Sequence, residues 1–113
     1  MNQAHELENY VRKNGRVPVD DWLADMNPQS RVKIRSKVNR LRYGNFSNCE
    51  PVGKGLSELK INYGPGFRVY FGRKNAKIIL LLCGGDKSSQ SSDIRSAHEL
   101  WDEFKYRSKG ERE

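Results

Sequence analysis

Three basic side chains and one tyrosine fall where they could act together on a phosphate. Lys60, Arg68 and Tyr70 alternate with apolar residues in two strand-like segments, and Lys87 follows a third. Side chains two apart on a strand share a face, so we expect Lys60, Arg68 and Tyr70 to point away from the core. An arginine binds phosphate through two parallel N–H groups. The pattern favours phosphate chemistry, although the same residues could simply solvate an open sheet face.

A hairpin is predicted to bring Lys60 and Arg68 together. Apolar or aromatic residues take every second position on both sides of the sequence Gly64-Pro65-Gly66. This period of two, interrupted by turn residues, predicts two half-buried antiparallel strands. Lys60 and Arg68 then lie at similar depth on neighbouring strands. The residues predicted to face the core are Leu59, Ile61, Tyr63, Phe67, Val69 and Phe71.

A third strand and the loop after it complete the predicted site. The segment from Ile78 to Cys83 is apolar throughout, which indicates a central strand whose second face is covered by the last helix. Tyr70 could then stack on a base, donate a proton, or pack under that helix. The segment from Gly84 to Gln90 is predicted as a loop whose glycines and helix-start amides could approach an anion. A plain strand-to-helix connection fits it equally well.

RNA cleavage without a metal ion is a reaction that these residue types suit. The 2′-hydroxyl of RNA attacks the adjacent phosphate, and the protein accepts a proton, neutralises the phosphorane and protonates the leaving oxygen. The two histidines, His5 and His98, are far apart, so acid–base work falls to Lys, Tyr, Asp or Glu. A lysine can serve as base where like charges or burial lower its pKa. Cys49 and Cys83 have no short spacing, and neither a metal site nor a cofactor is expected.

The composition indicates one small basic domain over residues 1–113. The chain is 35% hydrophobic and 31% charged, which is enough apolar material for one modest core. Lysine and arginine total 21 against 14 aspartate and glutamate, a net charge of +7. This excess favours a polyanionic partner such as nucleic acid, the ribosome or an acidic protein. No apolar run is long enough to span a membrane and no signal peptide is visible, so we expect a cytoplasmic protein.

The remaining segments predict an α+β domain. A short first strand from Leu7 to Lys13 precedes a helix whose apolar residues recur at helical spacing from Val19 to Met26. A second helix from Gln29 to Tyr43 forms a helical hairpin with it and leads into a loop from Asn45 to Gly55. The last helix is expected to begin near Ser91 or Ser92, and residues 107–113 are expected to form a frayed tail. The predicted order is β-α-α-β-β-β-α, with a mostly antiparallel sheet.

The second predicted helix carries a run of positive charge. Ile34, Val38 and Leu41 form its buried stripe. Its cations have no acidic residue among them and repel one another, which favours a role in binding RNA phosphates on the ribosome. A solvated basic face would explain the same residues. The cations are Arg31, Lys33, Arg35, Lys37, Arg40 and Arg42.

Two strings of the sequence resemble a known family. The resemblance is carried by LSELKINYGPGFRVYF and by KIILLLCGGDKSSQSSDIRSAHELW, which together are specific. They resemble addiction-module killer proteins of the RelE/HigB toxin superfamily, in particular its phage-derived branch, over roughly Leu7 to Phe104. The resemblance implies a compact sheet with helices packed on it and mRNA cleavage, often on the ribosome. It also implies a cognate antitoxin, frequently a helix-turn-helix DNA-binding protein.

The resemblance also implies roles for individual residues. It gives Arg68 a phosphate-binding or transition-state role, makes Lys60 a candidate general base, and makes Lys87 a candidate acid or phosphate clamp. Glu58 stands where some relatives carry a second lysine, and no residue matches the family's late catalytic tyrosine or histidine. Glu58, Tyr70 and Asp86 are therefore the alternative acid or base candidates.

Two further functions fit the same resemblance. A catalytically inactive homologue could still bind an antitoxin or the ribosome, and an acidic antitoxin segment could cover the basic helix. A phage protein of this branch could instead interfere with a host enzyme.

Overall fold

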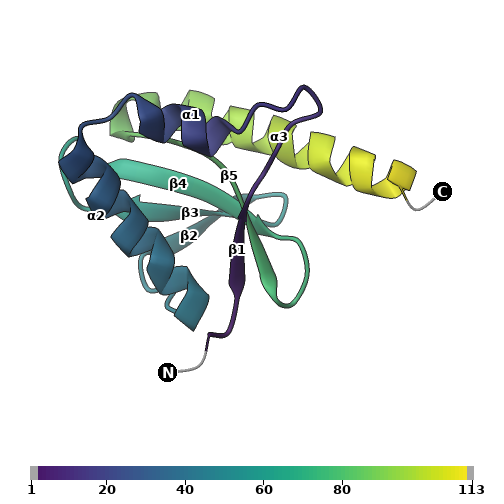
Figure 1. Cartoon of the computed structure of the whole chain (residues 1–113), viewed down its shortest axis with the longest axis horizontal. Coiled ribbons are helices and arrows are strands. Elements are labelled where there is room, and N and C mark those ends of the chain that lie inside the picture. The colour runs from purple at the N-terminus through teal and green to yellow at the C-terminus, as the bar shows by residue number, and fades with distance from the viewer. Residues whose placement is uncertain (1–2, 112–113) are drawn as a thin grey trace.

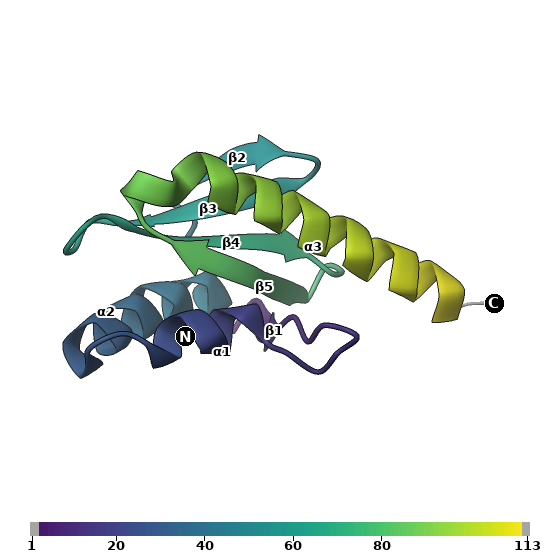
Figure 2. The same cartoon turned by 90° about the horizontal axis from the view of Figure 1, so that it is seen from above.

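Helices cover both faces of a five-stranded sheet in this computed structural model, which describes residues 3–111 (Figure 1). Figure 2 shows the last helix on one side of the sheet and the first two helices on the other. Among the described residues, no helix is long and apolar enough to cross a membrane. The elements are β1 (Glu6–Asn9), α1 (Pro18–Ala24), α2 (Pro28–Asn39), the 3-10 helix η1 (Arg40–Tyr43), β2 (Cys49–Gly53), β3 (Leu56–Ile61), β4 (Phe67–Arg73), β5 (Ile78–Gly85), the 3-10 helix η2 (Lys87–Ser89) and α3 (Gln90–Glu111).

The sheet is mixed and has one strand more than the sequence predicts. Its order is β1-β5-β4-β3-β2, with β1 parallel to β5 and the other neighbours antiparallel. The α+β class is confirmed, but the predicted order is wrong because β2 forms inside the expected loop. Its sequence contains Pro51 and no apolar alternation, so it carries no strand signal, and an edge position tolerates the proline. β1 stops at Asn9 rather than Lys13 because the chain turns back at Gly15, whose amide donates to Arg12 O at 2.8 Å.

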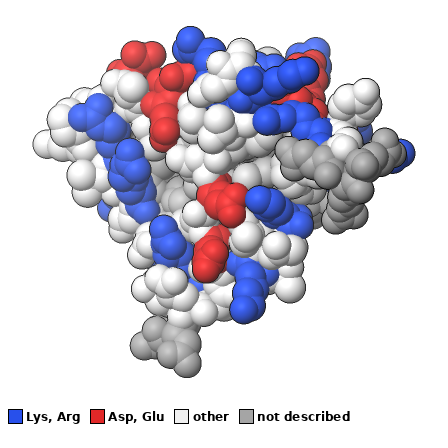
Figure 3. Space-filling model, turned by 45° about the vertical axis from the view of Figure 1, so that its right-hand side comes forward, with Lys and Arg blue, Asp and Glu red and all other residues white. Residues whose placement is uncertain are grey.

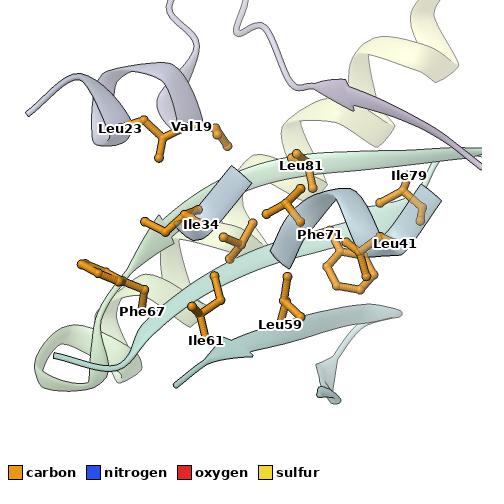
Figure 4. Packing of buried hydrophobic residues seen from close by; sticks show 12 residues of the cluster. Val19, Leu23, Ile34, Leu41, Leu59, Ile61, Phe67, Phe71, Ile79 and Leu81 are labelled. Atoms are coloured by element: carbon orange, nitrogen blue, oxygen red, sulfur yellow. The ribbon is translucent and has the colours of Figure 1, made fainter. Parts of the chain in front are cut away.

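The sheet face beneath α1 and α2 carries the larger apolar cluster (Figure 4). Ile34, Val38 and Leu41 meet the alternating residues of β3 and β4 there, which confirms the predicted core faces. Burying each such side chain contributes about 1.5–3 kcal/mol. After η1 the helical hairpin ends at Gly44, which has φ 77° as a left-handed helix terminus requires. The buried members of the cluster are Val19, Leu23, Ile34, Val38, Leu41, Leu59, Ile61, Phe67, Val69, Phe71, Ile79 and Leu81.

The opposite face of the sheet is covered by α3. Trp101 and its neighbours on this helix pack on apolar residues of β5, which confirms that β5 is covered on both faces. The helix begins at Gln90, directly after η2 and one residue before Ser91, close to its predicted start near Ser91 or Ser92. It also continues through residues predicted as a frayed tail, because Arg107 Nη1 donates to Val11 O at 2.8 Å. Residues 112–113 of that predicted tail lie outside the described part of the chain.

Candidate active site

Lys60 and Arg68 lie directly opposite each other on β3 and β4, which confirms the predicted hairpin register. Arg68 also pairs with Gly85, the last residue of β5. The β3–β4 turn and the start of α3 meet at this end of the sheet (Figure 2). Because paired residues share a face and α3 packs on that face, the predicted site lies at the rim between sheet and helix.

Arg68 is more enclosed than a surface arginine, with 11% of its side chain exposed. Its Nη1 donates to the backbone oxygen of Gly66 in the β3–β4 turn at 2.9 Å. Its Nε lies 3.5 Å from Oε1 of Glu58, at ion-pair distance but without hydrogen-bond geometry. Within residues 3–111, Nη2 forms no hydrogen bond. The guanidinium therefore keeps unused N–H groups that can bind an anion.

Glu58 is the carboxylate behind Arg68 and is 1% exposed. Its Oε2 accepts hydrogen bonds from the hydroxyl of Tyr70 at 3.0 Å and from Nε2 of Gln90 at 2.9 Å. A buried carboxylate needs such partners, because an unpaired charge away from water is strongly unfavourable. Glu58, Arg68, Tyr70 and Gln90 form one connected set, here called the buried network.

Tyr70 belongs to the interior and not to the surface of the site. Its side chain is fully buried under α3. Burial, followed by the negative charge of Glu58, raises the pKa of the Tyr70 hydroxyl. Of the roles predicted for Tyr70, packing under the last helix is therefore the one that the structure supports, and base stacking is excluded by its burial.

Lys60 and Lys87 flank Arg68 at the surface. Lys60 Nζ lies 3.1 Å from Oε2 of Glu50, but both side chains are substantially exposed and such pairs bind weakly. Lys87 is exposed on η2. A Cβ built on Gly66 would lie 3.5 Å from Nη1 of Arg68 and 3.6 Å from Cβ of Lys87, so these two residues approach each other across the turn. The structure thus places all three predicted catalytic residues at the same end of the sheet, with the ammonium group of Lys60 directed toward Glu50.

The segment from Gly84 to Gln90 is not the open anion loop that its composition allows. Asp86 caps η2 by accepting from the amide of Ser88 at 2.8 Å, so that amide is already used. Hydrogen bonds from Ser88 lower the pKa of Asp86, which makes it a weak base. The two glycines serve packing, since a side chain at Gly84 would collide with Trp22 and one at Gly85 with Asp93.

Comparison with known proteins gives a family match for this chain. The family model for phage-derived Gp49-like proteins matches residues 21–101, a span that contains the buried network and all three cations. The chain belongs to this family. The Gp49-like family is toxin-like and related to the RelE/HigB type.

The chain is also similar to a protein from Haemophilus influenzae. It is described as an uncharacterized protein and is 42% identical over 86 residues. The match covers 75% of the Gp49-like chain and 87% of the relative.

The basic helix of the Gp49-like protein divides its charge between two stripes. Arg31, Arg35 and Arg42 flank the buried stripe on one side, and the other three cations flank it on the other, as a spacing of 3.6 residues per turn requires. Figure 3 shows basic side chains in a diagonal band on the side of the molecule where α2 lies. In the described part of the chain, none of the six forms an ion pair. A groove of about 300 Å³ between α1, β1 and α2 is lined by Arg35 and Arg42, on the sheet face opposite Arg68.

The described residues of the Gp49-like protein contain neither a three-ligand metal cluster nor a cysteine with a lowered pKa. Within residues 3–111, His, Cys, Asp and Glu do not gather in groups of three that could hold a metal ion. Burial raises the pKa of Cys49 to about 11 and that of Cys83 to about 12, so both thiols stay protonated near neutral pH.

The hydrogen bond from Gln90 to Glu58 is not predicted from the sequence. Gln90 lies at the end of the expected loop, and only the fold brings its amide to Glu58 on a strand 32 positions earlier. The one sequence signal is Glu58 itself, an acidic residue on the face of β3 that a helix was expected to cover.

Replacing Tyr70 by phenylalanine should make the free energy of unfolding fall less steeply as pH rises above 10. The folded state raises the Tyr70 pKa above its ordinary 10.0, so the unfolded chain releases this proton more readily. The stabilisation is complete below pH 10 and is lost as pH rises toward the folded-state pKa. Above pH 10 we expect the free energy of unfolding to fall by up to about 1.4 kcal/mol per pH unit more in the wild type than in Tyr70→Phe.

Urea unfolding between pH 8 and pH 11 measures this difference. Tyr106→Phe is the matched control, because Tyr106 is 81% exposed, and it should follow the wild-type pH dependence. Parallel curves for wild type and Tyr70→Phe would contradict the burial of Tyr70 against Glu58.

Proposed function

We propose that this Gp49-like protein is the toxin of a toxin–antitoxin module and acts in the cytoplasm as a ribosome-associated mRNA endoribonuclease. The observation that carries the proposal is Arg68, a largely enclosed guanidinium with unused N–H groups, flanked at the surface by Lys60 and Lys87. A phosphodiester is the ligand that such a cluster fits best, because planar N–H pairs and nearby ammonium groups match its oxygens. The toxin-like family supports the same substrate class.

Cleavage is proposed to proceed by attack of the RNA's own 2′-oxygen. Lys60 accepts the 2′-hydroxyl proton while the bond from the 2′-oxygen to phosphorus forms. Arg68 binds the phosphorane oxygens, where charge accumulates in the transition state. Lys87 protonates the 5′-oxygen as its bond to phosphorus breaks, which yields a 2′,3′-cyclic phosphate and a 5′-hydroxyl. Neither step calls on a metal ion or cofactor.

A catalytically inactive homologue is the second candidate function, and the buried network favours it specifically. Glu58 and Tyr70 are held in internal hydrogen bonds, and Asp86 caps η2. Acid–base work would therefore rest on Lys60 and Lys87 alone. A protein of this kind would bind ribosome or antitoxin without cutting RNA.

The partner that the family suggests is an antitoxin, and we propose that it is of the helix-turn-helix DNA-binding kind. The unpaired cations of α2 are proposed to contact phosphates of ribosomal RNA. An acidic antitoxin segment lying in the groove beside Arg35 and Arg42 would be the other occupant of this surface. The two occupants differ in salt dependence, because only RNA releases a condensed counterion layer.

Arg68→Ala should abolish most RNA cleavage. Removing one preorganised group that stabilises the transition state lowers kcat by about 100- to 1,000-fold. Arg73→Ala, at the other end of β4 and beside Phe46, is the matched control and should cleave like the wild type. The assay combines purified protein, ribosomes and mRNA, with and without EDTA, and identifies the product ends.

Growth of a host lacking the antitoxin provides the cellular readout. Expression of wild type should arrest growth and fragment transcripts, and expression of Arg68→Ala should do neither. Equal growth and intact transcripts with both proteins would contradict the nuclease. Cleavage on ribosomes that Lys60→Ala removes would exclude the inactive homologue.

Neutralising three cations of α2 and η1 should weaken RNA binding in a salt-dependent way. Arg35, Lys37 and Arg40 are suited to this test, because within residues 3–111 they form no hydrogen bond through their side chains and no ion pair. Three lost phosphate contacts should reduce the slope of log affinity against log salt by about 2. The measurement is RNA binding by the triple glutamine variant between 50 and about 200 mM salt.

The matched control removes the same charge elsewhere. Lys54, Lys74 and Lys105 lie in exposed ion pairs with Asp102 or Glu8, and their triple glutamine variant should retain the wild-type slope. Equal losses in both variants would mean that net charge, and not α2, attracts the RNA. An unchanged slope together with weakened binding to an acidic peptide would assign α2 to the antitoxin.

A further inference from the structure

We infer that Glu58 is a positioning residue that orients the Arg68 guanidinium toward the scissile phosphate, an inference that rests on the proposed nuclease function. Glu58 was a candidate base by residue type alone. Its surroundings give it a different task, because its carboxylate is enclosed between the sheet and α3 and contacts Arg68 from behind.

The two oxygens of Glu58 are used differently. Tyr70 and Gln90 both donate to Oε2, which fixes the plane of the carboxylate. Oε1 is thereby directed to the Nε side of Arg68, at 3.5 Å. A carboxylate held by two donors from separate elements cannot rotate to meet an RNA hydroxyl, and with 1% exposure it offers substrate no approach.

Arg68 is restrained from two directions as a result. The turn oxygen of Gly66 accepts from Nη1, and Glu58 attracts the Nε edge. An unrestrained arginine samples many rotamers, and ordering it during the reaction would lower the rate. Restraint before substrate arrives leaves Nη2 and the outer edge of Nη1 as the groups that meet phosphate oxygens.

Gln90 connects this restraint to the helix. It is the first residue of α3, and its amide joins the helix start to β3 through Glu58. The position of α3 and the orientation of Arg68 are thus coupled by one side chain. The Gln90 side chain forms no other hydrogen bond in the described structure, which supports a role in holding Glu58.

Glu58→Gln tests the inference with little change of shape. The amide oxygen can still accept from Tyr70 and Gln90, but the NH2 group then faces the Arg68 guanidinium and no longer attracts it. We expect kcat to fall about tenfold or more and KM to stay within about threefold, because orientation matters most in the transition state. The double variant Glu58→Gln/Arg68→Ala should cleave no more slowly than Arg68→Ala alone, since Glu58 acts through Arg68.

A pH–rate profile separates positioning from base catalysis. If Glu58 only positions Arg68, Glu58→Gln keeps the midpoints of the wild-type profile at a lower plateau. Loss of the acidic limb would make Glu58 a base and overturn the inference. Glu103→Gln is the matched control, since Glu103 pairs with Arg12 at 3.3 Å outside the site, and it should retain wild-type rate and profile.

A measurement on Arg68 itself keeps the inference independent of cleavage. The buried Nε–H of Arg68 should exchange slowly with water in nitrogen-15 NMR spectra and become fast-exchanging in Glu58→Gln. If wild type does not cleave RNA, the proposed function fails, whereas this exchange still decides whether Glu58 orients Arg68.

If Glu58→Gln does not fold, Gln90→Ala replaces it and should lower kcat several-fold and speed the same exchange. The inference is overturned if the variant that folds keeps the wild-type kcat and an unchanged exchange rate of the Arg68 Nε–H. It is also overturned if the two substitutions of the double variant lower kcat by the product of their separate effects.

Discussion

One buried ion pair organises the end of the sheet on which the proposed chemistry depends. Glu58 and Arg68 lie on adjacent strands beneath the start of α3, where neither charge would be stable alone. Tyr70 on β4 and Gln90 on α3 supply the hydrogen bonds that the buried carboxylate requires. The hairpin register and the docking of α3 must therefore both be correct before Arg68 can present its unused N–H groups.

Two other groups of cations differ in their surroundings. Cations such as Lys54 and Lys74 lie in exposed ion pairs, which contribute little to stability. The cations of α2 have no such partners in the described residues, and Lys33 lies over the ring of Tyr63 at 5.6 Å, beside the β3–β4 turn. The basic helix thus reaches the same hairpin as Arg68 from the opposite face of the sheet.

Much of this arrangement follows from local pattern, and the remainder depends on tertiary packing. The period of two correctly predicts which residues of β3 and β4 face the core beneath α1 and α2, and that Lys60 and Arg68 are neighbours, because pleat geometry alone sets both. The role of Gln90 cannot be predicted that way, since its partner lies on a distant strand. Gly84 is likewise predicted as a loop residue, whereas the structure shows that any side chain at this position would collide with Trp22. β2 is missed because backbone pairing with β3, and not its own side chains, makes it a strand.

The central claim is that Arg68 binds the phosphate at which RNA is cut, and the Arg68 guanidinium resonance tests it most directly. Nitrogen-15 NMR spectra would be recorded while a short mixed-sequence RNA is added, with every 2′-hydroxyl methylated so that cleavage cannot occur. We expect the Arg68 Nε–H resonance to shift on RNA binding, together with the backbone amide of Lys87. RNA binding that shifts only resonances of α2 and leaves Arg68 unchanged would contradict it.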